Sequence, residues 1–287
     1  MTTLNQLQLV VYEENDIPGL IALSDSVGWD YDEFEIRTVM KSGEIFGYKN
    51  AEGEIVSSAA IIAYDSNVAS IGMVIVHENY RGLGLGKLAI QKCIESVSEH
   101  TVIMLVATDE GEPLYKKMGF ATVDYVHKYL NNNYFSDKNL ACNEYTIEDF
   151  YEQNFADIVS LDAAAFGVKR SNFLQNRIIQ SKQCIVMKDS HGKIIGFGLS
   201  ILGPLNLILG PIIAPDSLTA SLIINTLARD HNGKLRIDVP SGQAEFIKWL
   251  EQSGFTEAKK PPVMILHAEK MPIRNDTLFA IAAQIFG

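Results

Sequence analysis

The chain has 287 residues, 47% hydrophobic and 21% charged, a composition typical of a globular protein with about two domains. Its net charge of −11 argues against nucleic acid as a partner, because nucleic-acid binding requires a basic surface. No signal peptide is predicted, and no apolar segment reaches the roughly 18 residues of a membrane span. We therefore expect a cytoplasmic protein without membrane contact. Cys93, Cys142 and Cys184 stand alone, without the spacing of a metal site.

The first part of the chain predicts helices that carry a cluster of acidic and aromatic residues. Carboxylates and the face of a tryptophan suit an ammonium group. The same acids equally suit a solvated helix N-terminus, so both interpretations stay open. The cluster consists of Asp25, Trp29, Asp30, Tyr31, Asp32, Glu33 and Glu35.

The most informative motif follows a predicted hairpin. A short apolar strand ends at Val76, the next turn holds Arg81, Gly82, Gly84 and Gly86, and an amphipathic helix begins directly after it. Glycines let a ligand approach the backbone closely, and the first N–H groups of a helix have no partner inside it. A strand, a glycine-rich turn and a helix N-terminus in this order predict a phosphate-binding site.

Three glycine motifs compete for this turn. A P-loop requires Gly-x-x-x-x-Gly-Lys followed by serine or threonine, but a leucine follows Gly86-Lys87 and an arginine stands at the first glycine position. A dinucleotide-binding motif requires Gly-x-Gly-x-x-Gly, which is met only if Ala89 replaces the last glycine. The pattern Arg-x-x-Gly-x-Gly is met in full by Arg81, Gly84 and Gly86.

A second landmark follows in the expected order. Residues 102–107 predict a strand, and the next helix carries Tyr115 shortly before Gly119-Phe120. With both landmarks, the chain resembles the GNAT superfamily, the acetyl-CoA-dependent N-acetyltransferases. The alternative is an ordinary helix cap with flexible glycines, and a tyrosine that only packs on its helix.

The resemblance implies how acetyl-CoA would be held. Backbone amides of the turn would bind the pyrophosphate, and Arg81 would either pair with it or tether the turn. The preceding strand would bind the pantetheine arm like an added strand. No metal is implied. The coenzyme-binding residues implied are Val74, Ile75, Val76, Arg81, Gly82, Leu83, Gly84, Leu85, Gly86, Lys87, Thr108 and Tyr115.

The resemblance also assigns catalytic roles. Tyr115 would protonate the departing thiolate, a role that suits a phenol with a pKa near 10. Glu78 is the candidate general base that we carry forward, with His77, Asp65 or a water chain as alternatives. In the family, the early helical region borders the acceptor site, which gives the acidic and aromatic cluster a place next to the amine.

The second half of the chain repeats the first. A hairpin with a glycine turn, an apolar strand and a helix that ends in Gly-Phe recur in the same order. The phosphate-binding turn does not recur, because Asp216 or Ser217 caps the corresponding helix, and Leu250 replaces Tyr115. We expect this half to bind no coenzyme and to shape the acceptor site. Phe166, Phe173 and Phe197 would either wall that site or form core.

These patterns predict an α/β protein of two tandem GNAT-like domains, each a mixed, mostly antiparallel central sheet flanked by helices. The domains expected are residues 1–135, catalytic and coenzyme-binding, and residues 140–287, degenerate. The function expected is transfer of an acetyl group to the primary amine of a small molecule or peptide, and the sequence leaves room for a homodimer. One rival is a non-catalytic acyl-CoA-binding regulatory module, and another is a nucleotide-binding oxidoreductase.

Overall fold

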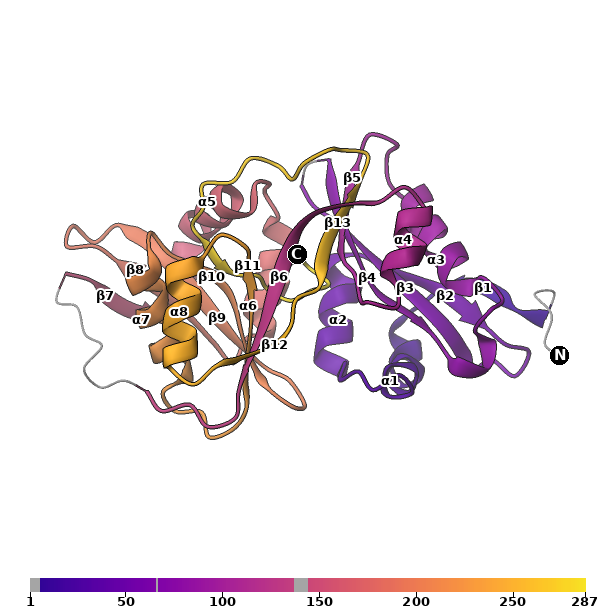
Figure 1. Cartoon of the computed structure of the whole chain (residues 1–287), viewed down its shortest axis with the longest axis horizontal. Helices are drawn as coiled ribbons and strands as arrows, with labels where there is room; N and C mark the ends of the chain where they lie inside the picture. The colour runs from indigo at the N-terminus through magenta and orange to yellow at the C-terminus, as the bar shows by residue number, and fades with distance from the viewer. Residues whose placement is uncertain (1–5, 66, 137–143) are drawn as a thin grey trace.

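The computed structural model describes residues 6–65, 67–136 and 144–287, so Cys142 and most of the predicted interdomain stretch lie outside the described residues. Two α/β halves lie side by side along the long axis of the molecule (Figure 1). Each half contains a mixed, mostly antiparallel sheet flanked by helices, as the sequence predicts. Within the described residues, no helix is long and apolar enough to cross a membrane.

The N-terminal half pairs its strands in the order β1-β2-β3-β4-β5, and only β4 and β5 run parallel. Helices α1 and α2 pack on one face, on Ala60 and Ile62, while α3 and α4 pack on the other, on Ala59 and Ile61. The alternation follows from the two-residue period of a strand. The elements are β1 (Gln8–Val11), α1 (Ile17–Asp25), α2 (Glu33–Ser42), β2 (Glu44–Lys49), β3 (Ile55–Ala63), β4 (Val68–Val76), α3 (Leu85–Glu95), β5 (Val102–Val106), α4 (Glu112–Lys117) and β6 (Ala121–Asn131).

The C-terminal half repeats this plan in the order β7-β8-β9-β10-β11, again with one parallel pair, β10 and β11. Glycines with positive φ recur at matching places: Gly28 and Gly167 after the first helix, Gly119 and Gly254 before the strand that follows the last helix. The elements are β7 (Thr146–Asp149), α5 (Phe155–Phe166), α6 (Ser171–Gln180), β8 (Gln183–Lys188), β9 (Ile194–Leu202), β10 (Leu207–Ile213), α7 (Ser217–Ala228), β11 (Leu235–Pro240), α8 (Ala244–Gln252), β12 (Thr256–Lys259), β13 (Pro262–Leu266) and β14 (Leu278–Ala280).

The two halves exchange strands. Strand β13, which follows β12 in the C-terminal half, inserts between β5 and β6 of the N-terminal sheet. The long strand β6 pairs with β13 through residues 121–125 and then, from residue 126 onward, lies between β11 and β12 of the C-terminal sheet. Figure 1 shows β6 crossing from one half to the other beside β13. Each sheet is thus completed by the other half, and the division at residues 135–140 stays a prediction.

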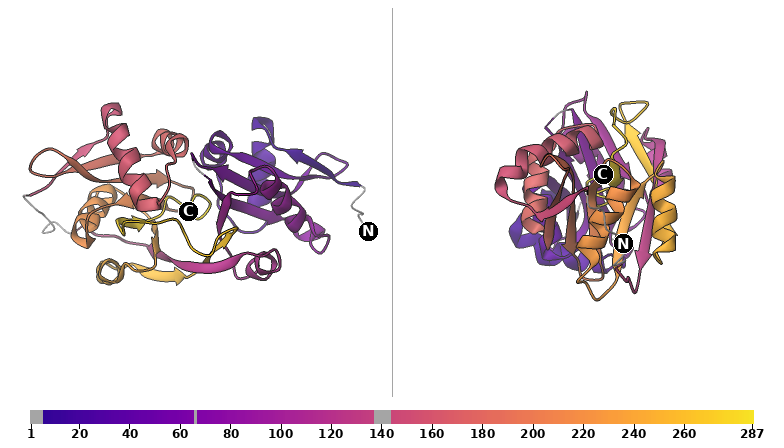
Figure 2. Two further views of the ribbon diagram at one scale, coloured as in Figure 1. Left: turned by 90° about the horizontal axis from the view of Figure 1, so that it is seen from above. Right: turned by 90° about the vertical axis from the view of Figure 1, so that its left-hand side faces the viewer.

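A common core joins the halves. Helix α2 packs against α6, and one hydrophobic cluster contains residues of both, among them Ile36 and Phe173. Residues 281–287, all buried except half-buried Gln284, lie between the halves, as the view from above in Figure 2 shows for the end of the chain. Phe166, Phe173 and Phe197 are buried in this cluster, so they form core, the more conservative of the two sequence interpretations.

Candidate active site

The glycine-rich turn adopts the conformation that its sequence demands. After β4, a short 3-10 helix (Glu78–Tyr80) leads into Arg81, and Gly82 and Gly84 have φ of 81° and 78°. Gly84 is the N-cap of α3, in the left-handed region that residues other than glycine rarely adopt. A Cβ at Gly82 or Gly84 would meet nothing within 4 Å. Backbone conformation and ligand approach, rather than crowding, explain these two glycines.

The turn presents a row of unused hydrogen-bond donors. Among the described residues, no acceptor contacts the backbone N–H groups from Gly82 to Lys87, and the first N–H of the helix that is bonded belongs to Leu88, which donates to the Gly84 carbonyl at 3.1 Å. The Arg81 side chain is exposed and makes no hydrogen bond or ion pair with the described residues, so it does not tether the turn. Free N–H groups at the positive end of a helix form an anion-binding concavity.

A wedge opens beside the turn. Strands β4 and β5 pair only from Val68–Val102 to Ile71–Leu105 and then diverge, which leaves the second half of β4 without a partner on its β5 side in the described chain. Met73, with φ of 49°, lies at the register shift between β3 and β4, and the Ser58 hydroxyl donates to its carbonyl at 2.6 Å. A bulge of this kind bends a strand. The edge from Gly72 to Val76, which includes the predicted Val74, Ile75 and Val76, is thereby open to an extended ligand.

The corresponding wedge of the C-terminal half is closed by the chain itself. Strands β10 and β11 diverge after Leu209–Ile237, and β14 pairs with the freed end of β10. The Ile281 N–H donates to the Asp238 carbonyl of β11 at 2.9 Å, so the segment bridges the two strands. Helix α7 is capped at its N-terminus by the Asp216 carboxylate, which accepts from the Thr219 N–H at 2.8 Å and places a negative charge where an anion would bind; this confirms the predicted cap.

Tyr115 lies on α4 with 7% of its surface exposed, in the cluster formed by α3, α4 and β5. Its ring packs edge-on against Phe120, with centroids 5.8 Å apart. Burial, and secondarily the neighbouring Cys93, raises the pKa of the phenol. No acceptor for its hydroxyl occurs among the described residues, unlike the hydroxyl of buried Tyr64, which donates to the Phe286 carbonyl. The side chain is mostly buried but its hydroxyl oxygen remains accessible, so it is available to donate a hydrogen bond to a group that binds beside it.

Comparisons with known proteins agree with this geometry. A model of the acetyltransferase (GNAT) family matches residues 10–120, and an acetyltransferase (GNAT) domain model matches residues 158–280. The uncharacterized N-acetyltransferase YitH of Bacillus subtilis is 40% identical over 281 residues, 98% of each chain. The chain belongs to the GNAT superfamily. It is an acyltransferase of the N-acetyltransferase type, with two GNAT domains in tandem.

Solved GNAT structures share the fold over nearly the whole chain. A putative acetyltransferase from Pyrococcus horikoshii is 18% identical, with a TM-score of 0.80 over 100% of this chain and 98% of its own. A tandem GNAT protein from the clavulanic acid biosynthesis pathway is 12% identical, with a TM-score of 0.66 over 91% of this chain and 98% of its own. These likenesses support the double architecture.

The candidate bases of this GNAT protein separate in space. Glu78 begins the 3-10 helix after β4 and is exposed, and the His77 Nδ1 accepts from the Asn79 N–H. Asp65 lies at the opposite end of β4, where its carboxylate accepts from the N–H and hydroxyl of Ser171. Asp65 is therefore not brought to the turn. Thr108 follows β5 and accepts from the Gly111 N–H, so it lies at the start of α4.

The early acidic and aromatic cluster divides in the GNAT fold. Glu33 pairs with Arg37 on the surface, Asp32 caps α2, and Glu35 contacts Arg177 of the other half at 2.5 Å. Asp25 is exposed at the end of α1, and Trp29, Asp30 and Tyr31 lie on the loop between α1 and α2. Trp29 and Tyr31 have ring centroids 6.1 Å apart. Burial, then the charge of Glu35, raises the pKa of Tyr31.

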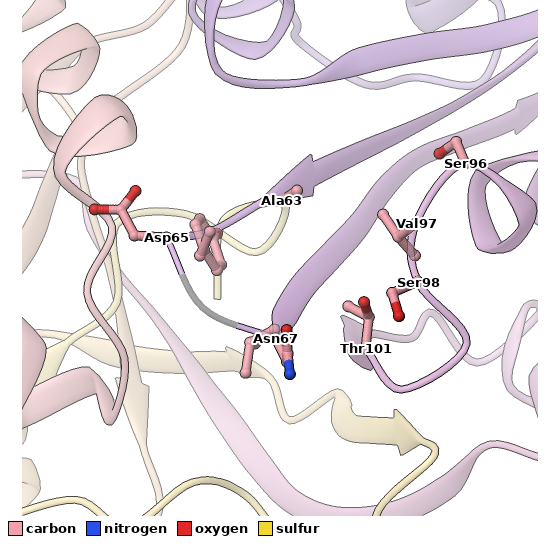
Figure 3. Close-up of a pocket in the computed structure, with 9 residues that line it drawn as sticks. Ala63, Asp65, Asn67, Ser96, Val97, Ser98 and Thr101 are labelled. Atoms are coloured by element: carbon pink, nitrogen blue, oxygen red, sulfur yellow. The ribbon is translucent and has the colours of Figure 1, made fainter.

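One open hollow lies away from the wedge between β4 and β5. It has a volume of about 360 Å3 and lies at the start of β4 and the end of α3, lined by Asp65, Asn67, Ser98 and Thr101 among others (Figure 3). The turn at Gly82–Lys87 lies at the other end of β4. The described residues contain no cluster of three potential metal ligands.

Three features of the site had no signal in the sequence. These are the strand exchange, the closure of the second wedge by β14, and the connection between β13 and β14 that reaches the cleft between the halves. Apolar runs predict strands but do not name their partners. The apolar residues among 278–287 are typical of a buried segment but do not say where in the fold it lies.

Proposed function

We propose that this protein transfers an acetyl group from acetyl-CoA to a primary amine by direct attack in a ternary complex. The observation that carries the proposal is the continuous row of unpaired N–H groups from Gly82 to Lys87 beside the open edge of β4. The amides fit a diphosphate, and the strand edge fits the amide groups of a pantetheine arm. Bound there, the coenzyme supplies an activated acetyl group as a thioester.

Each residue then has one task. The β4 edge fixes the thioester in the wedge, and Glu78, directly or through water, removes a proton from the ammonium group. The amine nitrogen bonds to the acetyl carbon as the carbon–sulfur bond breaks. Tyr115 gives its proton to the departing thiolate and regains one from solvent, and the attacking nitrogen releases its extra proton to Glu78 or water. Its raised pKa keeps the phenol protonated at neutral pH, so the proton is present when the thiolate forms.

Turnover with a panel of primary amines tests the proposal. Thiol release is measured for wild type and for Tyr115→Phe, with coenzyme affinity measured separately by calorimetry. We expect release with at least one amine, and a loss of rate in the variant at unchanged coenzyme affinity. Tight coenzyme binding without thiol release from any amine would instead identify a non-catalytic acyl-CoA-binding module.

A further inference from the structure

A second, enclosed cavity lies between the halves on the α1–α2 face of the sheet. It is tight, with room for about one water molecule. Val106 of β5 and Val263 of β13 line its floor, and Met271 and Arg274 reach it from the connection between β13 and β14. Because β5 forms one side of the catalytic wedge, this cavity adjoins the place where an acceptor amine has to arrive.

Arg274 enters the cavity with unused donors. Its Nε donates to the Phe166 carbonyl at 2.9 Å, and its guanidinium carbon lies 5.2 Å from the centre of the Phe166 ring. Its two terminal nitrogens make no hydrogen bond and no ion pair with the described residues. Burial, and then the like charge of Arg170, lowers the pKa of Arg274 to about 10, while the negative charges of Asp124 and Asp162 act in the opposite direction, so the group stays charged at neutral pH.

Arg170 shows what a satisfied buried arginine looks like in the same region. Its guanidinium holds the Asp162 carboxylate through two hydrogen bonds, of 2.7 and 2.9 Å, and also donates to the Phe286 carbonyl. Asp162 is thereby fully engaged with Arg170. The planar fork of Arg274 has no such partner, and a carboxylate matches its geometry.

Asp124 of β6 lines the same cavity and is also free of an ion pair. One carboxylate oxygen accepts from the Tyr125 N–H at 2.7 Å, which leaves the other for a ligand. Asp124 and Arg274 thus share one cavity without pairing with each other. A ligand that carries both an ammonium group and a carboxylate would pair with both residues at once.

We propose that the acceptor is an amino acid, whose carboxylate binds Arg274 and whose amino group is oriented by Asp124 toward the β5 side of the wedge. This assignment rests on the proposed acetyl transfer and narrows its substrate class. The cavity has to widen to admit an amino acid, which requires the connection at residues 267–277 to move outward. This connection contains no helix or strand. A single guanidinium in a tight cavity favours a carboxylate over a bulkier phosphate.

Matched pairs of ligands test the assignment. Each of the twenty standard amino acids, and the amine that remains when its α-carboxylate is removed, is titrated calorimetrically into the protein saturated with coenzyme A. We expect at least one amino acid to bind about tenfold or more tightly than its matched amine. Arg274→Gln should weaken binding of the amino acid by at least about tenfold, because it breaks a buried, charged, hydrogen-bonded pair. Binding of the matched amine should not change.

Two further variants guard against misfolding and nonspecific charge effects. Arg229→Gln removes an exposed arginine of the C-terminal half and should change nothing. Asp124→Asn should weaken binding of the amino acid and of its matched amine alike, and the preference for the carboxylate should persist. This variant tests the site even if Arg274→Gln fails to fold.

Equal binding of amino acids and matched amines, or no binding of any amino acid, overturns the assignment. Thiol release from amines without a preference for the carboxylate would leave the proposed acetyl transfer standing and remove only this acceptor class. Carboxylate-selective binding without thiol release would support the binding of an amino acid and contradict the proposed acetyl transfer.

Discussion

The two halves share one fold but treat the same two structural features in opposite ways. In the N-terminal half, the wedge between β4 and β5 is open and the N–H groups before α3 are unpaired. In the C-terminal half, β14 occupies the wedge and Asp216 occupies the helix N-terminus. The fold therefore leaves a strand edge and a helix N-terminus that need hydrogen-bond partners. Only in the C-terminal half does the chain itself supply partners for both.

The difference explains why the second half persists without a coenzyme loop. Its strand β13 completes the N-terminal sheet next to β5, and Arg177 of α6 holds Glu35 of α2 and the Ala282 carbonyl. Removing the second half would expose the edge of β5 beside the wedge. That the second half shapes the acceptor site stays a prediction from the sequence.

The largest expected effect concerns Tyr115, which Leu250 replaces in the second half. Tyr115→Phe should lower kcat by about 10²–10⁴, the usual worth of a positioned proton donor. Coenzyme affinity should stay unchanged, and Tyr151→Phe, at an exposed tyrosine of the second half, should have no effect. A rate within a few fold of wild type would show that the buried hydroxyl only packs.

The same tyrosine predicts a pH dependence. Its folded pKa is raised above the ordinary value near 10, so the proton needed for transfer remains bound as pH rises through 8 and 9. A profile of kcat against pH should therefore show no fall on the alkaline side below about pH 10. A loss of rate centred near pH 8 would contradict a buried phenol as the acid.

Gly84→Asp tests the open turn. A carboxylate there places a side chain and a like charge where the diphosphate binds, and the loss of two charge-assisted hydrogen bonds of about 1.5 kcal/mol each predicts about 100-fold weaker coenzyme binding. Gly192→Asp is the matched control, because it has a similar φ of 78° and equally open space in the second half. Coenzyme affinity within about threefold of wild type would show that the diphosphate does not bind at this turn.

Gly210→Ala tests the closed wedge. A Cβ at Gly210 would lie 2.0 Å from the Ile281 carbonyl oxygen, so the segment after β14 has to shift, and we expect a loss of about 1–3 kcal/mol in the free energy of unfolding. Gly233→Ala, whose Cβ would meet only the ring of partly exposed His231, should cost much less. Coenzyme should still bind at one site per chain, since the Asp216 carboxylate still caps α7; a second site would show that β14 alone excludes it.

The smallest expected effect is that of Asp216→Ala. Loss of a helix cap should lower stability by about 1 kcal/mol, visible as a lower melting temperature. Coenzyme affinity should not change. A marked loss of affinity would mean that both halves bind coenzyme and would end the contrast between them.

The sequence predicts the parts of this site that depend on local chemistry. Gly82 and Gly84 require a left-handed turn, Asp216 signals a helix cap, and Tyr115 precedes a Gly-Phe pair on a short helix; the structure has each of these features. Their catalytic roles remain proposals. Local pattern also detects the repeat, because the same turns and helices recur in order.

Long-range pairing could not be predicted in the same way. The apolar run at β13 specifies a strand, yet nothing in it distinguishes a place beside β12 from one beside β5. Arg274 and Asp124 stand 150 residues apart in the sequence and belong to no motif. Only the exchange of strands and the path of the 267–277 connection bring them to one cavity.

A crystal structure with coenzyme A bound tests the central claim most directly. We predict one coenzyme per chain, with its diphosphate on the N–H groups of Gly82–Lys87 and its pantetheine arm along Val74–Val76. A coenzyme bound at α7, or a Gly82–Lys87 turn that stays empty in crystals saturated with the ligand, would contradict the account.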